Sequence, residues 1–257
     1  RMLGLFMVMP VFVLLGNDLQ HATPLLIGLA IGAYGFSQAL LQVPFGLLSD
    51  RVGRKRMIYI GLVLFAAGSL LAAATDSIYV VIAGRILQGA GAIASVLMAL
   101  LSDLTREEYR TKAMATVGIS IGLSFSVSLV LGPMLGAIWG LSGIFYLTAA
   151  LSVVALVIVA RLVPTPHAHK TSADTRPARE MLGQVLKNGR LLRLDFGIFA
   201  LHFVLTALFL VFPTMLQNSL GLAAGSHWWF YLTVMVTSFF AMVPFIIIGE
   251  KKRKMKP

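Results

Sequence analysis

The chain has no cysteine among its 257 residues and little charge of either sign. Without cysteine it can form neither a disulfide framework nor a thiolate site for metal or redox chemistry. Charged residues make up 12% of the sequence and hydrophobic residues 58%, with a mean hydropathy of +0.88. Soluble globular domains carry roughly 25% charged residues. The composition therefore indicates an integral membrane protein.

Acidic residues are the scarcer charges: there are 10 Asp and Glu against 21 Lys and Arg, which gives a net charge of +11. On a soluble protein such a surplus would indicate a nucleic-acid partner. Here the basic residues follow the ends of apolar stretches, where they would face anionic lipid headgroups. We therefore expect a lipid bilayer, and no nucleic acid, as the partner of these residues.

Long apolar stretches recur along the chain. Most are about 18 to 25 residues long, which is enough to cross a hydrocarbon core of about 30 Å. They end near Leu15, Ser49, Ala74, Ser102, Ala137, Ala160, Leu216 and Gly249. We expect eight membrane-spanning helices and thus an all-α, multi-pass membrane protein.

The connections between these stretches alternate in charge. Those rich in Lys and Arg are 51–56, 103–112, 161–193 and 251–256. Those without Lys or Arg are 17–24, 75–77, 138–142 and 217–227. Basic loops stay in the cytoplasm by the positive-inside rule, so the alternation predicts the orientation. In this scheme Arg1 lies at the cytoplasmic end of the first helix, and only Arg85 falls within a span.

Two short patterns occur twice and in the same order. The tripeptide VPF at 43–45 precedes a basic loop and returns at 243–245, and an FxVxP pattern that starts at Phe6 starts again at Phe209. This order indicates an internal repeat of six helices. A complete second copy would need four more helices after Pro257, so we expect eight helices of a twelve-helix plan.

The segment between the two copies is polar and contains three prolines, as expected of a linker. Four of its residues have helical spacing and indicate either an interfacial helix or a solvated connector: Met181, Leu182, Val185 and Leu186. His167 and His169 lack a third ligand, so we expect no metal site. The expected parts are a six-helix bundle at 1–162, a cytoplasmic linker at 163–190 and two helices of an incomplete second bundle at 191–257.

Three motifs carry a resemblance to a known family. The connection GLLSDRVGRKR at 46–56 resembles the loop signature between helices two and three of the major facilitator superfamily. Arg85-x-x-Gln88-Gly89 matches a second motif of that family, and Gly132-Pro133-x-x-Gly136 is similar to the signature of its drug:proton antiporter branch. The phrase LLSDLTRE at 100–107 is similar to the YajR-type group of bacterial transporters. The resemblance implies the major facilitator fold in a bacterial inner membrane.

The first motif also has a physical interpretation. Asp50 precedes Arg54 by four residues, a spacing that favours an ion pair along one helix. Asp103 can join them if the second and fourth helices are neighbours. The resemblance implies that this network latches the two halves together in the outward-facing state, although the charges could instead only anchor a loop. The predicted latch comprises Gly46, Asp50, Arg51, Gly53, Arg54, Lys55 and Asp103.

Two residues are candidates for moving charge or protons. Arg85 lies about 10 Å inside its helix, where an arginine costs about 2.5 to 3.5 kcal/mol and needs a polar partner. It either binds backbone carbonyls of a neighbouring helix or, as the resemblance implies, adjusts protonation during transport. His202 suits proton exchange near neutral pH but could equally be a neutral, hydrogen-bonded side chain. Since no Asp or Glu lies in the middle of a span, only the resemblance implies proton coupling.

Polar residues within spans normally face inward, toward partners or a cavity. They predict a substrate cavity lined by Tyr34, Gln38, Gln42, Gln88, Ser120, Ser124 and Thr206. The serines could instead bond to their own helix. Gly132 and Pro133, with Gly136, predict a kink and a close-packing site, and their role in antiport is implied by the resemblance alone.

We therefore expect a secondary transporter that exports a small amphipathic compound in exchange for protons by alternating access. It would act as a monomer without a cofactor, and not as an enzyme, because no nucleophile, base and orienting group fall at workable positions. Two alternatives stay open: a uniporter or symporter of a small nutrient, and a non-transporting membrane scaffold.

Overall fold

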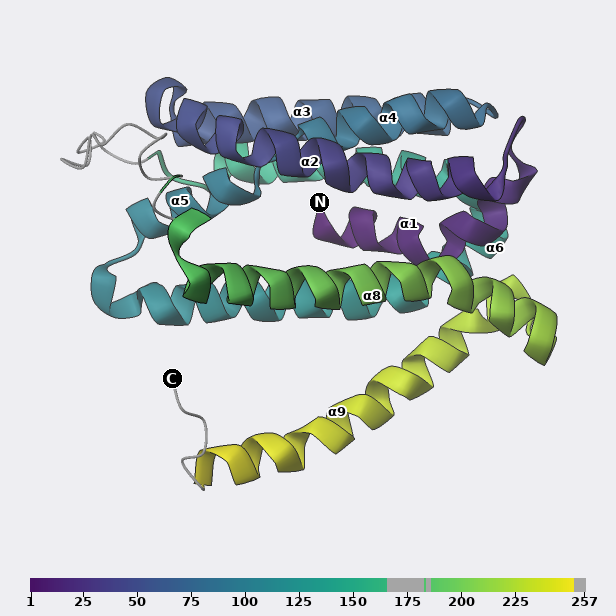
Figure 1. The fold of residues 1–257 in the computed structure, drawn as a ribbon. Coiled ribbons are helices and arrows are strands. Elements are labelled where there is room, and N and C mark those ends of the chain that lie inside the picture. Colours follow the sequence, from purple (N-terminus) through teal and green to yellow (C-terminus); the bar gives the residue numbers. More distant parts are fainter. Residues whose placement is uncertain (166–182, 184–185, 252–257) are drawn as a thin grey trace.

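A computed structural model describes residues 1–165, 183 and 186–251 of the chain, and the expected positions 167, 169, 181, 182 and 185 in the linker lie outside this part. The described residues form long helices (Figure 1). Their bounds are α1 Met2–Leu15, α2 Pro24–Val52, α3 Arg54–Ala73, α4 Ile78–Ala90, α5 Ala94–Leu104, α6 Arg110–Arg161, α8 Gly189–Leu220 and α9 His227–Lys251, with 3₁₀ turns η1 Gly16–Asp18, η2 Glu107–Tyr109 and η3 Ala224–Ser226.

The expected all-α membrane architecture is confirmed. Five segments of the described chain are long and apolar enough to cross a bilayer, and α4 and α5 together make up one of them. The first helix, with 14 residues, is shorter than a full crossing. Each proline of the two recurring patterns lies inside a helix: Pro10, Pro44, Pro213 and Pro244.

The 52-residue α6 is two antiparallel arms rather than one rod. Gly140 has φ +65° and ψ −171°, a conformation that glycine adopts without the steric cost of a Cβ. On either side of it, Ser128 Oγ bonds to the carbonyl of Leu3 at 2.8 Å and Thr148 Oγ1 lies 3.4 Å from that of Gly4. Both arms therefore pack against the same turn of α1, as the expected break near 138–142 requires.

The fourth span, expected to be one helix, is interrupted between α4 and α5. The chain leaves the helix at 91–93, where α3 comes close. A Cβ at Gly91 would lie 2.3 Å from the carbonyl oxygen of Gly61, and one at Gly61 would lie 2.1 Å from the Ile93 side chain. The interruption thus lies where two glycines let the backbones of α3 and α4 nearly touch.

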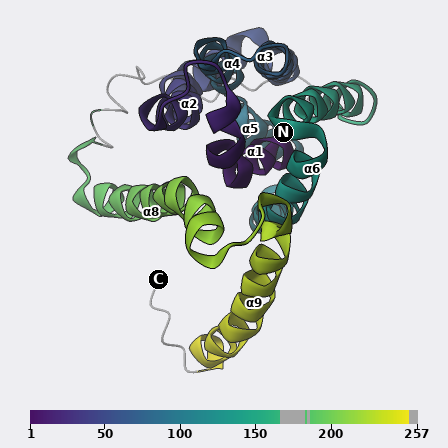
Figure 2. The ribbon, with the colours of Figure 1, turned by 90° about the vertical axis from the view of Figure 1, so that its right-hand side faces the viewer.

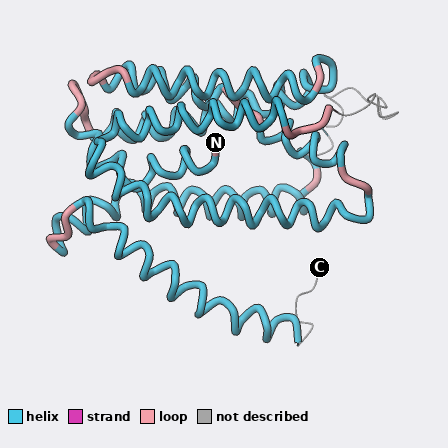
Figure 3. Tube along the Cα trace, turned by 180° about the vertical axis from the view of Figure 1, so that it is seen from behind, coloured by secondary structure: helices cyan, strands magenta, loops and turns pink. Residues whose placement is uncertain are grey.

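The loops gather at two ends of the helices (Figure 3). At one end, Lys55 Nζ donates to the carbonyl of Val163 at 2.7 Å, which joins the start of α3 to the end of α6. At the other, the backbone N–H of Gln20 donates to the carbonyl of Asp76 at 2.7 Å. We call the first the basic end, because its loops carry the Lys and Arg residues, and the second the opposite end.

Helix α1 lies in the middle of the bundle, as the view along the helices shows (Figure 2). Its buried side chains, among them Met7 and Phe12, form the largest apolar core with residues of α2, α3, α4 and α6. Helices α8 and α9 lie on one side of this group (Figure 2). A second core, around Met57 and Ile93, lies at the basic end. The polar residues around Arg85 and around Arg54 thus lie next to packed apolar cores.

Candidate functional site

Arg54 is the centre of a charged network at the basic end. Its guanidinium forms a salt bridge with Asp50 of α2 and another, at 3.2 Å, with Asp103 of α5. It also donates to Ser49 Oγ at 2.5 Å and to the carbonyl of Gly46 at 3.5 Å. The Arg54 side chain is 13% exposed, and those of Asp50 and Asp103 are 53% and 32% exposed. One cation thus ties the ends of α2, α3 and α5 at a half-exposed site.

The ion pair of Asp50 and Arg54 does not lie along one helix, contrary to the sequence-based expectation. Gly53, with φ +104°, ends α2 and starts α3, so the pair spans the turn between two helices. Few side chains adopt this φ, which explains the glycine. Nearby, a Cβ at Gly46 would lie 3.2 Å from Ser95 Oγ, and Ser95 donates to the carbonyl of Gln42 at 2.9 Å. Helices α2 and α5 are therefore close neighbours here.

The remaining members of the expected latch have different surroundings. Arg51 is exposed at the end of α2, whereas Lys55 binds the carbonyl of Val163. Ser49, which the sequence analysis missed, is fully buried and receives a hydrogen bond from Arg54 while donating to the Gly46 carbonyl at 2.5 Å. The motif GLLSDRVGRKR contains this serine, but the spacing of a single serine does not indicate that it lies buried beside Arg54.

A second polar cluster surrounds Arg85 in the interior. Arg85 is 2% exposed and donates to the carbonyl of Ala30 of α2 at 3.3 Å and to Gln88 Oε1 at 2.8 Å. Gln88 donates in turn to Ser69 Oγ of α3 at 2.7 Å. The Arg85 guanidinium also lies 4.7 Å from the centroid of the Tyr34 ring, a cation–π distance. Its positive charge is thus held by a carbonyl, an amide and a ring, all neutral.

Glycines let the neighbouring backbones approach this cluster. A Cβ at Gly89 would lie 2.2 Å from the backbone oxygen of Tyr34, and one at Gly84 would lie 2.7 Å from that of Gly68. Small residues at such contacts are typical of packed membrane helices. The motif Arg85-x-x-Gln88-Gly89 therefore combines a cation, its partner and the contact to α2 on one turn of α4.

Arg1 lies in the interior and not at the basic end, which corrects the sequence-based assignment. Its Nη2 donates to Tyr34 Oη at 2.9 Å and to Gln38 Oε1 at 3.0 Å, and its guanidinium lies 5.2 Å from the centroid of Phe65. Figure 1 marks the N-terminus midway along the bundle. The length of α1 in the sequence already indicates this position. A helix of 14 residues extends only about 21 Å from the opposite end, so it does not reach the basic end.

Of the expected cavity residues, Tyr34, Gln38 and Gln88 come together around the two arginines. The others do not join them. Ser120 and Ser124 donate to carbonyls four residues back on their own helix, each at 2.8 Å. Gln42 lies where α2 meets α5, with its backbone carbonyl accepting from Ser95 at 2.9 Å, and Thr206 belongs to α8, as does the expected relay residue His202.

His202 is not brought near the cluster around Arg85. Its ring Nδ1 lies 2.8 Å from the carbonyl of Ile198 on its own helix, and its side chain is exposed. Thr206, one turn further, is half-buried. Among the residues that the structure describes, no three His, Asp or Glu side chains converge as metal ligands.

The backbone of α6 stays helical through Gly132 and Pro133, and its non-helical residue is Gly140. Gly132 is a close-packing site: a Cβ there would lie 2.7 Å from the carbonyl oxygen of Met7 of α1. A Cβ at Gly136 would lie 3.4 Å from Cγ1 of Val11, which belongs to the same helix as Met7. The motif therefore brings the first arm of α6 against α1.

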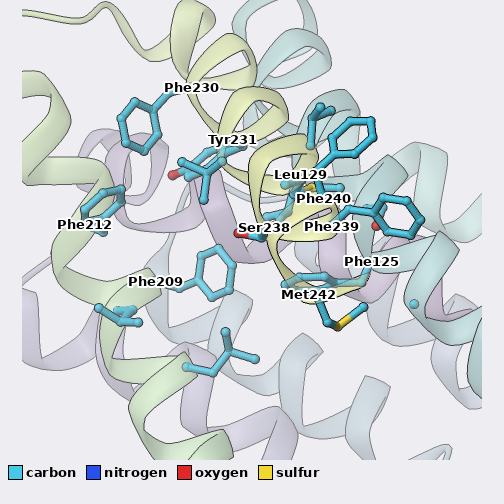
Figure 4. Close-up of a pocket in the computed structure, with 17 residues that line it drawn as sticks. Phe125, Leu129, Phe209, Phe212, Phe230, Tyr231, Ser238, Phe239, Phe240 and Met242 are labelled. Atoms are coloured by element: carbon cyan, nitrogen blue, oxygen red, sulfur yellow. The ribbon is translucent and has the colours of Figure 1, made fainter. Parts of the chain in front are cut away.

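An apolar cavity of about 830 Å³ lies between α6, α8 and α9, and the sequence analysis did not foresee it. Phenylalanines dominate its wall (Figure 4). Its labelled lining residues are Phe125, Leu129, Phe209, Phe212, Phe230, Tyr231, Ser238, Phe239, Phe240 and Met242. The sequence does not indicate which of its aromatic residues face a cavity. Only the packing of α6, α8 and α9 shows which of them line it.

Comparison with known proteins agrees with this architecture. The Major Facilitator Superfamily profile matches residues 1–257. The inner membrane transport protein YajR of Escherichia coli is 48% identical over 256 residues, which cover all of this chain and 56% of that protein. An uncharacterized transporter of Buchnera aphidicola is 40% identical over 98% of this chain and 65% of its own length.

A more distant relative, the class H tetracycline resistance protein of Pasteurella multocida, is 32% identical over 141 residues, or 54% of this chain and 34% of that protein. The chain spans less than two thirds of the length of each of these relatives. With its membrane-length helices and its inner-membrane relative, it is a multi-pass inner-membrane protein. The chain belongs to the Major Facilitator Superfamily of secondary transporters and is not an enzyme.

Proposed function

We propose that this chain forms part of a proton-coupled exporter of small amphipathic compounds. The observation that carries the proposal is the position of Arg54, which bridges Asp50 of α2 and Asp103 of α5 at the basic end. A cation shared by two carboxylates from different helices holds these helix ends in one arrangement. The arrangement changes if a carboxylate takes up a proton or the helices move.

The proposed organisation has a six-helix bundle at 1–162, a cytoplasmic linker at 163–190 and the first two of six further helices at 191–257. The two bundles of one chain would rock about a substrate site near the middle of the membrane. Proton and substrate must then bind the two conformations of the transporter with different affinity, because otherwise the proton gradient cannot drive export. The Arg54 network would stabilise one state, and protonation of a carboxylate in it would release that state.

The two expected relay residues have different support. Arg85 is buried and bonded to Ala30 and Gln88, so it can sense changes on α2. His202 lies on α8 with a bond to its own helix. We assign Arg85 a role in positioning α2 and α4, and His202 a role in proton exchange on the second bundle. Export of a drug-like compound is supported further by the name of the Pasteurella relative, a tetracycline resistance protein.

Proton-driven efflux in inverted membrane vesicles tests the proposal on the full-length transporter that contains this sequence. We expect efflux that collapses with an uncoupler and that falls about two- to fivefold in Asp50→Asn, because Arg54 loses one of its two anionic partners. Asp76→Asn is the matched control, since it removes the same charge from an acid at the opposite end. Efflux that is insensitive to the uncoupler would contradict proton antiport and support a uniporter.

A further inference from the structure

The charges inside the described bundle are unbalanced. Two arginines, Arg1 and Arg85, have their guanidinium groups near the single ring of Tyr34, at 6.0 and 4.7 Å from its centroid. The acids among the described residues lie near helix ends or in turns: Asp18, Asp50, Asp76, Asp103, Glu107, Glu108, Asp195 and Glu250. As far as the structure describes the chain, the interior of this half therefore holds two cations and no carboxylate.

The two arginines differ in how completely they are bonded. Arg85 uses Nε and Nη1 on the Ala30 carbonyl and on Gln88. Arg1 is half-buried and directs one nitrogen, Nη2, to both of its partners, while its buried Nε has no hydrogen-bond partner among the described residues. A buried donor without an acceptor is unfavourable, and more so when the group carries a charge. Arg1 is thus the cation with unused binding capacity.

The partners of Arg1 leave donors and not acceptors available. Tyr34 Oη accepts from Arg1, so its own proton is free to be donated. Gln38 accepts from Arg1 through Oε1, which leaves its NH₂ group to donate. Since Tyr34 and Gln38 lie one turn apart on α2, these donors and the guanidinium share one face. A group that only accepts hydrogen bonds and carries negative charge complements them.

We infer that Arg1, Tyr34 and Gln38 bind the carboxylate of the transported compound, so that the substrates are organic anions rather than lipophilic cations. Since Nη2 of Arg1 already serves Tyr34 and Gln38, its Nη1 is the nitrogen left to donate to a carboxylate oxygen, and such charge-assisted bonds are about twice as strong as neutral ones. In a site of low dielectric constant the second cation, Arg85, adds to the attraction. This inference rests on the proposed export function, which it refines by naming the substrate class.

Three ligands that differ only in their polar group test the charge preference. They are 4-phenylbutyrate, its amide and 4-phenylbutylamine, which are negative, neutral and positive. Their dissociation constants are measured by calorimetry on the full-length transporter in lipid nanodiscs, with empty nanodiscs as the baseline for partition into lipid. We expect the carboxylate to bind at least about tenfold more tightly than the amide, and the amine most weakly. An amine that binds as tightly as the carboxylate overturns the inference.

Variants then locate the site. Arg1→Gln should weaken the carboxylate about tenfold and leave the amide unchanged, whereas Arg1→Lys should retain part of the preference because it keeps the charge. Arg193→Gln, which removes an exposed arginine at the start of α8, is the matched control and should change nothing. If Arg1→Gln fails to fold, Tyr34→Phe tests the same site by removing one donor. Equal weakening of all three ligands would contradict a carboxylate site.

The inference and the export function fail separately. Carboxylate binding that depends on Arg1, without uncoupler-sensitive efflux, would refute proton-coupled export and keep the anion site. Uncoupler-sensitive efflux of a cation, with no preference for the carboxylate in binding, would refute the anion site and keep the exporter.

Discussion

Arg54 and Arg85 belong to helices that pack on one another, yet they are stabilised in opposite ways. Arg54, at the basic end, meets two carboxylates that water still reaches. Arg85, in the interior, is 2% exposed and meets a carbonyl, an amide and an aromatic ring. The same side chain thus has ionic partners where the dielectric constant is high and neutral partners where it is low.

The difference follows from the cost of removing charges from water. Half-exposed ion pairs gain little stability because solvent and salt screen them, but they form and break readily, as a conformational contact must. A buried cation costs several kcal/mol, and a fixed set of hydrogen bonds must offset it. We therefore expect the interior cluster to determine stability and the basic-end network to determine which state is populated.

Replacing one glycine by alanine in each region should give the largest difference between the two regions in the loss of unfolding free energy. A Cβ at Gly89 would lie 2.0 Å from Ser37 Oγ and 2.2 Å from the backbone oxygen of Tyr34, whereas at Gly46 it would lie 3.2 Å from the side chain of Ser95. Because backbone cannot rotate aside, we expect Gly89→Ala to lower the free energy of unfolding by about 3 kcal/mol and Gly46→Ala by less than about 1 kcal/mol. Denaturant titration of the purified protein measures both; equal losses would remove the contrast.

An intermediate effect is expected from removing one polar partner in each region. Gln88→Leu deprives the buried Arg85 and Ser69 of a partner and should cost about 2 kcal/mol of unfolding free energy. Asp103→Asn leaves Arg54 with its α2 partners at an exposed site and should cost about 0.5 kcal/mol. The same titration compares the two variants. If Asp103→Asn cost more than Gln88→Leu, the division between stability and conformational control would be wrong.

Salt should produce the smallest effect and the sharpest distinction. The coupling free energy between Arg54 and Asp103, from a double-mutant cycle, should be below about 1 kcal/mol. It should fall by about half between about 0.05 M and about 0.5 M NaCl, as the Debye length shortens. The coupling between Arg85 and Gln88, which water does not reach, should stay constant in the same experiment. A parallel fall of both couplings would show that the interior cluster is hydrated.

Several residues of the site were predictable from local pattern, and others were not. The four-residue spacing of Asp50 and Arg54 predicted their pairing but placed it on one helix, because it ignored the turn that Gly53 makes. The counting of charges by loop assigned Arg1 to the basic end, although the length of α1 places it in the interior. Polar spacing could not separate Tyr34, which meets both arginines, from Ser120, which bonds to its own helix.

By itself the sequence determined the membrane class, the helical architecture and the alternation of basic loops, because these depend on the hydropathy, length and charge of contiguous segments. Its motifs also identified the family. Only the tertiary structure decided which neutral groups surround Arg85, which donors remain free beside Arg1 and where the aromatic cavity lies. These depend on the close approach of helices distant in sequence, which glycines permit, and spacing along one chain carries no record of that approach.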